Sequence, residues 1–367
     1  MKMTSKERML TALHGGKPDR LPVTIHQWMP YHLNNYMGGI DQIEAFRYFG
    51  MDAAVTDHSL FYYKDTPDWI DRIVSSKVVD GVNFQEHEVT TPGGKLHYVY
   101  CSNAHTGWYT EHMIKEPEDI YLLRDYYPRM GIHRDKVAEV YSRLGDDGIL
   151  RACVPDFQGG CFQATHMLAG TEEMIFACYD DPDWVHEFLE ILVERRLEFI
   201  TEEMRHVKFD LVENGGGGGS DTVISPNMHR EFCLPYDKRV HDALHSINTP
   251  VVYHTCGGMM NLLDIIPENG CDASETLSPP SIGGNMRRED RVRVKQTLGS
   301  KVSLIGGMDQ FNLLTTGTPE QIEDEVQNLF ETFGVGGGYM MSACDHFFDA
   351  PLENLKVFAD AAKKCIY

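Results

Sequence analysis

The segment Pro250-Val251-Val252-Tyr253-His254-Thr255-Cys256-Gly257-Gly258 is an apolar, β-branched run that ends in a histidine and a cysteine two residues apart. In a β-strand, residues i and i+2 face the same side, so His254 and Cys256 are predicted to project together beyond the strand end. Gly257-Gly258 is predicted to turn the chain into a helical segment over residues 259–266. The pair therefore belongs at the carboxyl end of a strand, where α/β proteins build their sites. Two ligands do not hold zinc, so a third must come from elsewhere.

The rest of the chain alternates short apolar strands with helices. Eight strands are predicted outside the hairpin segment described next, and each later strand is followed by a helix. This alternation is typical of an α/β fold of the (β/α)8, or TIM, barrel type. No internal repeat or low-complexity linker divides the chain, so residues 1–367 are expected to form one domain. The predicted strands are 21–25, 53–56, 149–154, 210–213, the run ending at His254, 272–276, 302–305 and 339–343, and the predicted helices are 5–13, 42–49, 117–126, 135–144, a long region over 163–207, 227–246, 287–297, 319–333 and 351–363.

Residues 73–109 depart from this alternation. Val, Phe, His and Tyr alternate along the segment, and Thr91-Pro92-Gly93-Gly94 has the composition of a turn. The pattern predicts antiparallel hairpins inserted into the barrel sequence, and we expect them to cover one end of the domain.

Composition limits the partners and the compartment. Lys and Arg number 33 against 55 Asp and Glu, which gives a formal net charge of −22. Such a surface repels nucleic acid and anionic membranes, so neither is an expected partner. The first residues lack an apolar signal core and no apolar run reaches membrane-spanning length, so a cytoplasmic location is expected. Nine cysteines without an export signal indicate reduced thiols, some of them available as metal ligands.

The third zinc ligand should follow another strand, because the carboxyl ends of barrel strands open on one face. Cys344 follows the predicted strand 339–343 and is the candidate. Ligation by one histidine and two cysteines leaves the fourth position of zinc open, as in catalytic sites. Cys271 and Cys233 are alternative candidates for the third ligand, but Cys271 begins a strand and Cys233 lies within a predicted helix. The alternative is that His254 and Cys256 are ordinary strand residues and Cys344 is a small buried hydrophobe.

Two glutamates and a set of polar and aromatic residues complete the candidate site. Glu275 and Glu213 end the strands on either side of His254 and are candidate catalytic groups, and Glu275 is also a candidate fourth ligand or partner of a ligand. A solvated carboxylate is the alternative for each. Gly215–Gly219 has no Gly-Lys-Ser/Thr ending, so it is not a phosphate loop; it either admits a bulky ligand close to the backbone or is a mobile loop. The substrate-pocket candidates, which suit a planar or apolar substrate, are His26, Trp28, Asp57, His58, Asp156, Phe157 and His346.

With these residues assembled, the sequence resembles the uroporphyrinogen decarboxylase superfamily, and within it the zinc- and corrinoid-dependent methyltransferases. The resemblance spans nearly the whole chain and implies a (β/α)8 barrel. In the methyltransferase branch it implies zinc ligation by His254, Cys256 and Cys344. The stretches that carry it are Ser5-Lys6-Glu7-Arg8, Lys17-Pro18-Asp19-Arg20-Leu21-Pro22-Val23, Glu231-Phe232-Cys233-Leu234-Pro235-Tyr236, His254-Thr255-Cys256-Gly257 and Ile305-Gly306-Gly307-Met308-Asp309.

The decarboxylase branch carries an arginine-containing stretch after its first strand, and this chain does not. The corresponding residues are Ile25-His26-Gln27-Trp28-Met29-Pro30, which match a polyanionic tetrapyrrole poorly. The resemblance therefore implies methyl transfer, in one of two directions. Zinc either activates a thiol such as coenzyme M for attack on a methylcobamide, or polarises a methylated substrate while Co(I) takes the methyl group.

The histidine-rich, aromatic mouth favours the second direction, with a small methylated substrate such as a methoxylated aromatic. No Asp-x-His-x-x-Gly stretch is present, so the cobamide is expected on a separate corrinoid protein. The non-enzymatic alternative is a docking module for such a protein with a structural zinc, which would normally have four protein ligands.

Overall fold

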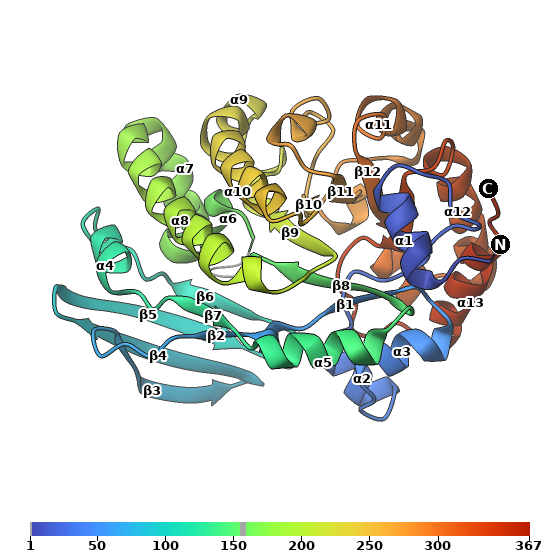
Figure 1. Cartoon of the computed structure of the whole chain (residues 1–367). Coiled ribbons are helices and arrows are strands. Elements are labelled where there is room, and N and C mark those ends of the chain that lie inside the picture. The colour runs from blue at the N-terminus through green and yellow to red at the C-terminus, as the bar shows by residue number, and fades with distance from the viewer. Residues whose placement is uncertain (1, 155–158) are drawn as a thin grey trace.

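A computed structural model describes residues 2–154 and 159–367, and its centre is a curled parallel sheet (Figure 1). The sheet confirms the predicted α/β barrel-like fold, and its seven strands follow the order β1-β8-β9-β10-β11-β12-β13. Each strand lies within a few residues of its predicted range. They are β1 (Ala53–Thr56), β8 (Gly148–Cys153), β9 (Leu211–Gly215), β10 (Val251–His254), β11 (Ala273–Thr276), β12 (Ser303–Met308) and β13 (Tyr339–Ala343).

The eighth predicted strand, 21–25, is reduced to a single bridge that lies between β13 and the start of β1. Val23 bridges Met341 in parallel. The Met341 N–H donates to the Pro22 carbonyl and the Thr24 N–H donates to the Met341 carbonyl, both at 2.9 Å. On the other side, the Asp52 N–H donates to the Val23 carbonyl at 2.8 Å. Hydrogen bonds on both sides of this segment join the two edges of the curled sheet.

The side chain of Asp52 explains why this segment is not a regular strand. The buried carboxylate accepts the Val23 N–H at 3.0 Å, which removes that donor from the sheet ladder. It also accepts hydrogen bonds from Arg8 Nη1 at 2.6 Å and Arg20 Nη1 at 2.8 Å. One side chain therefore connects the amino-terminal helix, residues 21–25 (the closing segment) and the start of β1.

Helices surround the sheet, and the two chain ends lie near each other on one side of the molecule (Figure 1). The long helical region predicted over 163–207 is divided, with breaks at Gly170 and before Pro182. The segment 259–266 forms turns rather than the predicted helix. Within the described residues, no helix combines the length and apolarity needed to cross a membrane. The helices are α1 (Ser5–Leu13), α2 (Pro30–Tyr36), α3 (Gln42–Phe49), α4 (Asp119–Tyr126), α5 (Arg134–Leu144), α6 (Cys161–Ala169), α7 (Thr171–Asp180), α8 (Pro182–Glu202), α9 (Pro226–Met228), α10 (Leu234–Ser246), α11 (Arg291–Thr297), α12 (Pro319–Phe333) and α13 (Leu352–Lys363).

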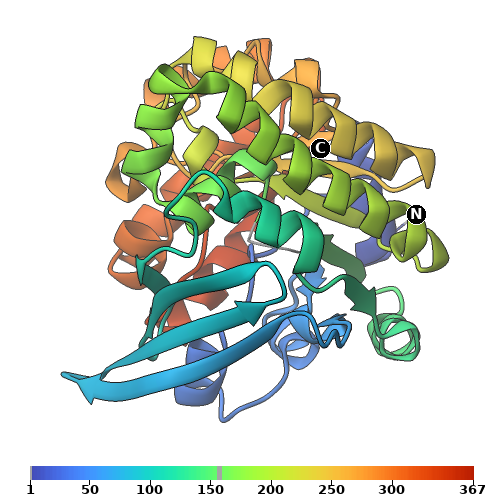
Figure 2. The same cartoon turned by 90° about the vertical axis from the view of Figure 1, so that its left-hand side faces the viewer.

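The predicted hairpin insertion is a four-stranded antiparallel sheet that projects from the barrel (Figure 2). A further two-stranded pair, β2 (Phe61–Tyr63) with β7 (Met130–Ile132), was not expected from the sequence. The inserted strands are β3 (Ile70–Val79), β4 (Val82–Thr91), β5 (Gly94–Ser102) and β6 (Gly107–Glu111).

The inside of the barrel is built in layers, because alternate residues of each strand point inward. One layer is apolar and packs against α1. Two residues further along β8, β9, β10 and β11 the inward positions are polar or charged. The apolar layer consists of Ala54, Ile149, Leu211, Val252, Ala273, Ile305 and Met340.

Replacing Asp52 with alanine should lower the free energy of unfolding by about 3 kcal/mol, because Arg8 would lose a buried carboxylate partner and the Val23 N–H would be left unpaired. Denaturant titration followed by circular dichroism measures the loss. The control is Glu268→Ala, which removes the carboxylate of an exposed ion pair with Arg230 and should barely move the midpoint. Equal losses for both variants would contradict the closing role of Asp52.

Candidate metal and substrate site

Four neighbouring strands place a charged layer directly above the apolar layer. Each of these inward residues lies two positions after an apolar one, as the period of a strand requires. Consecutive strands in the sheet therefore present their side chains to one another in the barrel interior. The four residues, from β8, β9, β10 and β11 in order, are Arg151, Glu213, His254 and Glu275.

Arg151 lies between the two glutamates. Its Nη2 donates to Glu275 Oε1 at 2.8 Å and Oε2 at 2.9 Å, and to Glu213 Oε2 at 3.0 Å. Arg151 and Glu275 are both about 98% buried. Burial alone would disfavour the Glu275 carboxylate, but the Arg151 guanidinium outweighs it and holds the pKa of Glu275 well below its usual range. Glu275 is therefore a buried, charged acceptor.

The sequence analysis missed Arg151, although a signal was present. In Gly148–Cys153 it is the one charged residue of an otherwise apolar strand, and it falls on the inward-facing parity. A lone charge on a barrel-interior position needs an opposite charge close by. Glu213 and Glu275, already selected as strand-end carboxylates, supply it.

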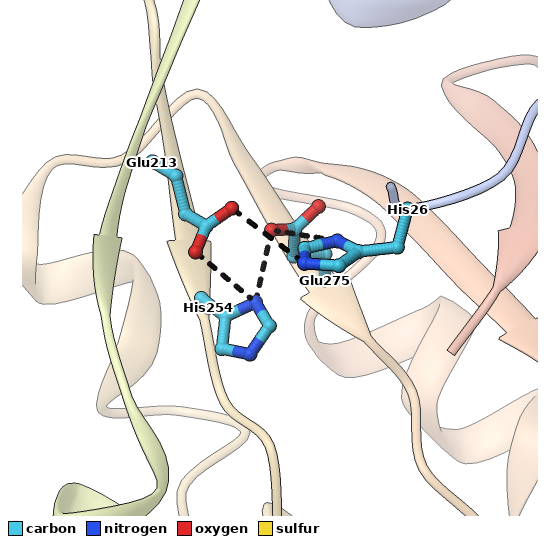
Figure 3. A group of neighbouring side chains, drawn as sticks. All are labelled: His26, Glu213, His254 and Glu275. Atoms are coloured by element: carbon cyan, nitrogen blue, oxygen red, sulfur yellow. Dashed lines mark hydrogen bonds and ion pairs between the residues drawn. The ribbon is translucent and has the colours of Figure 1, made fainter. Parts of the chain in front are cut away.

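His254 is oriented by the same carboxylate. Its Nδ1 lies 3.0 Å from Glu275 Oε1 and 3.6 Å from Glu213 Oε1 (Figure 3). With a charged acceptor at Nδ1, that nitrogen carries the proton and Nε2 is left with its lone pair. This is the arrangement by which proteins present histidine to a metal ion. Glu275 therefore lies beside a candidate ligand, which is the position that a partner of a ligand would take.

Cys256 and Asp345 complete a group with His254. One ligand atom from each of the three residues lies within 4.8 Å of the others, and Cys256 and Asp345 are both partly exposed. A second group shares Asp345 and joins it to His26 and His346. Donors that follow β10 and β13 therefore lie close together at the carboxyl face of the barrel, with Asp345 in the place where Cys344 was predicted.

Cys344, the predicted third ligand, joins none of the three groups of closely spaced ligand atoms found among the described residues; the third group is that of His26, Glu213, His254 and Glu275. It is fully buried, and its Sγ lies 3.7 Å from the Leu277 carbonyl at the end of β11. The charged groups that act on this thiol are Asp309, Asp345 and Arg291. Asp345 is the neighbour whose ligand atom reaches His254 and Cys256.

The two predicted histidines of the pocket meet at this face. The rings of His26 and His346 have centroids 5.2 Å apart in an edge-to-face arrangement, and His26 is 5.1 Å from His254. Burial lowers the pKa of His26 to about 3, so its imidazole is neutral at pH 7. The structure thus brings together His26 and His346 with the candidate ligands.

Three other predicted pocket residues, Trp28, Asp57 and His58, are not among the described residues that line the cavity. Trp28 is a correction: it packs in the core, stacked on Phe49, because the chain bends after His26 and leads into α2. Asp57 caps a short 3-10 turn through the Ser59 N–H. His58 lies 3.8 Å from Cys153 Sγ. Asp156 and Phe157 lie outside the described residues.

A cavity of about 840 Å³ opens above the ligand group. Its walls come from the inserted sheet, α6, the glycine segment 215–219 and the turn after β13. Aromatic side chains form much of it, and Asp345 is the one acidic residue among the described residues that line it. None of these residues is a lysine or an arginine. The aromatic members are Trp108, Tyr109, Phe311 and Phe348.

A curled parallel barrel with its candidate site at the carboxyl ends of the strands defines the general class of this protein. A model of the family described as "Uroporphyrinogen decarboxylase (URO-D)" matches residues 97–365. The chain therefore belongs to the uroporphyrinogen decarboxylase family.

Relatives in this family carry two kinds of name. The chain is 26% identical over 206 residues to a methylated-thiol–coenzyme M methyltransferase of Methanosarcina mazei, covering 55% of this chain and 51% of that protein. It is 30% identical over 208 residues to a uroporphyrinogen decarboxylase of Actinobacillus pleuropneumoniae, covering 54% of each. The chain thus spans about half the length of the curated relatives it matches. A solved structure, a methyltransferase from Methanosarcina mazei, shares the fold over 99% of both chains, with a TM-score of 0.65 and 16% identity.

Replacing Glu275 with glutamine should weaken zinc binding roughly 10- to 100-fold, because the charged acceptor that orients His254 is lost. Competition with a chromophoric chelator measures the affinity. The matched control is Glu325→Gln, which alters another buried carboxylate, one paired with Arg291 away from the site. Unchanged affinity in folded Glu275→Gln protein would show that Glu275 does not act on the metal site.

Proposed function

We propose that this protein is a zinc-dependent methyltransferase that moves a methyl group between a small methylated substrate and the Co(I) of a corrinoid carried by a separate protein. The observation that carries the proposal is a histidine and a cysteine at one strand end, of which Cys256 lines a cavity without lysine or arginine among its described lining residues. Methyltransferases among the similar proteins support it.

The donor set fits zinc. His254 presents one ring nitrogen while Glu275 accepts at the other, and Cys256 supplies a soft sulfur ligand two residues away. These are residues that a zinc ion would draw together rather than displace.

Cys344 remains our proposed third ligand, with Asp345 as its competitor. Zinc favours thiolate over carboxylate, and Cys344 directly follows β13, next to Asp345. Asp345 has the closer ligand atom in this structure. Three protein ligands would leave one position for the substrate heteroatom.

The cavity favours a neutral, partly aromatic substrate over either anionic candidate. Uroporphyrinogen carries many carboxylates, and coenzyme M carries a sulfonate. Both call for cationic partners, whereas the described residues lining this cavity include neither lysine nor arginine. The Trp108, Tyr109 and Phe348 rings suit a flat apolar body. A methoxylated aromatic compound matches these walls.

Zinc, when bound, would supply a Lewis acid for the heteroatom that carries the methyl group. The protein's own residues would orient the metal ligand and shield the substrate from water. Arg151 holds Glu275 charged, Glu275 orients His254, and the aromatic walls keep water from the substrate. His346 Nδ1 lies 2.6 Å from Asp345 Oδ1, so this pair can hold the proton that a departing oxygen takes up.

The ligand assignment predicts the zinc content of three variants. Cys256→Ser and Cys344→Ser should each lower zinc affinity by orders of magnitude, because each removes a thiolate from a three-ligand site. Asp345→Asn is the matched comparison and should retain most of the affinity. Chelator competition on folded protein provides the measurement. Loss of zinc from Asp345→Asn, with retention in Cys344→Ser, would assign the third place to Asp345 instead.

Methyl transfer should require zinc and Co(I) corrinoid together. In an anaerobic assay, zinc-loaded protein should convert Co(I) to methyl-Co(III) cobalamin with a methoxylated aromatic compound, and the change is followed by absorbance. Metal-free protein should remain folded, because the apolar layer and the surrounding helices supply the core, yet it should be inactive.

Two controls separate the alternatives. Uroporphyrinogen should yield no coproporphyrinogen, and methyl-Co(III) cobalamin with coenzyme M should transfer slowly. Equal rates with and without zinc would refute the mechanism. A protein that binds a corrinoid protein and zinc but transfers no methyl group with any of these substrates would instead be a docking module.

A further inference from the structure

His166 is a buried polar side chain without a partner in the wall of the cavity. It belongs to α6 and is 5% exposed. Its Nε2 is buried and accepts or donates no hydrogen bond within the part of the chain that the structure describes, and its Nδ1 makes none there either. A neutral imidazole has one donor and one acceptor, and buried polar groups nearly always find partners. The ring also lines the cavity, which is where a partner can enter.

The glycine segment brings His166 and Cys256 to one stretch of wall. A Cβ atom on Gly217 would lie 3.3 Å from Cys256 Sγ, and a Cβ atom on Gly218 would lie 2.9 Å from His166 Nδ1. Consecutive Cα atoms are about 3.8 Å apart, so a molecule the size of a substituted benzene ring can contact both side chains. Glycine at both positions lets the backbone pack closely against Cys256 and His166, and both of these side chains line the same cavity.

This wall is held in position. Gln163, one helical turn before His166 on α6, accepts the Gly218 N–H at 2.7 Å through Oε1. His166 itself packs edge-to-face on Phe162, with ring centroids 4.6 Å apart. Helix and glycine segment therefore form one rigid surface, and the imidazole does not need to reorganise to meet a ligand.

The chemistry of His166 selects the kind of group it can bind. Burial lowers the pKa of His166 to about 4, with His112 adding to the effect, so the ring is uncharged at pH 7. An uncharged imidazole in a cavity whose described lining includes no lysine or arginine gives little compensation for a buried carboxylate. A hydroxyl group, which both donates and accepts, pairs with it without charge.

We propose that His166 is a specificity-determining residue that hydrogen-bonds a neutral hydroxyl substituent on the aromatic body of the substrate, while the methylated heteroatom lies at Cys256. The inference rests on the proposed function and deepens it: the preferred substrates are methoxyphenols rather than unsubstituted methoxybenzenes. Discrimination arises because methoxybenzene would leave the His166 ring unpaired beside a ligand that excludes water.

Binding of the three methoxyphenol isomers and of methoxybenzene to zinc-loaded protein tests this by isothermal titration calorimetry, without a corrinoid. At least one isomer should bind roughly tenfold more tightly than methoxybenzene, the effect of about one net hydrogen bond. In His166→Leu the preference should fall to within about twofold, and His166→Asn should restore part of it. The matched control is His206→Leu, which removes an exposed imidazole outside the cavity and should retain the preference.

Three results would overturn the proposal: no isomer preferred by wild-type protein, an unchanged preference in folded His166→Leu, or an equal loss in His206→Leu. If His166→Leu does not fold, the His166→Asn variant decides the question. Complete loss of the preference for methoxyphenol over methoxybenzene in His166→Asn would then count against the hydrogen bond. Because binding is measured without methyl transfer, failure of the proposed reaction and failure of this inference give different results.

Discussion

The contact of Arg151 with Glu213 and Glu275 is the interaction on which the interior of this barrel depends. Arg151 and Glu275 are removed from water, while Glu213 stays partly exposed. The free energy lost by dehydrating the buried pair roughly cancels the attraction between its charges. Folding stability alone therefore does not account for the arrangement. What the contact provides is a charged, immobile carboxylate at Glu275, two residues above the apolar layer and beside His254.

Strand geometry converts this contact into a site. Because inward residues recur every second position, the apolar layer, the charged layer and the outermost layer of each strand are stacked in order. On β10 these positions are Val252, His254 and Cys256. The apolar residue fills the barrel, the histidine is oriented from the side by Glu275, and the cysteine meets the cavity. One strand of alternating residues thus connects the core to the surface where a substrate enters.

Much of the fold could be predicted because it depends on local patterns. Thr4 caps the start of α1 and forms a capping box with Glu7. Thr318 caps the start of α12, and Pro319 is its first residue. Both helices were predicted with their observed bounds. The closing segment was not, because the Asp52 carboxylate that takes the Val23 N–H comes from 29 residues away. No local pattern reports such a contact.

The positions of the site residues along the chain could be predicted, but not all of their side-chain directions. Positions at strand ends could be inferred, so His254, Cys256, His26 and His346 come together as expected. Side-chain direction after a strand ends could not be inferred, and Trp28 turned into the core for that reason.

His166 was not a candidate because it lies within a helix, where a histidine gives no signal by spacing. It lines the cavity because the glycine segment after β9 folds against α6, a contact between residues 55 positions apart in sequence.

Membership of the family leaves the chemistry open, because relatives named as decarboxylases and as a methyltransferase share this barrel. The barrel supplies the position of a site, whereas the side chains around it supply the reaction. In this chain the arginine of the region, Arg151, is paired with two glutamates in the barrel interior. The described residues that line the cavity include no lysine or arginine. A carboxylate-rich substrate would meet aromatic rings, uncharged histidines and Asp345. Arg151, the cation nearest the site, is instead paired with Glu213 and Glu275 beside the candidate ligand His254, and this distribution of charge is the physical basis for our proposal of methyl transfer.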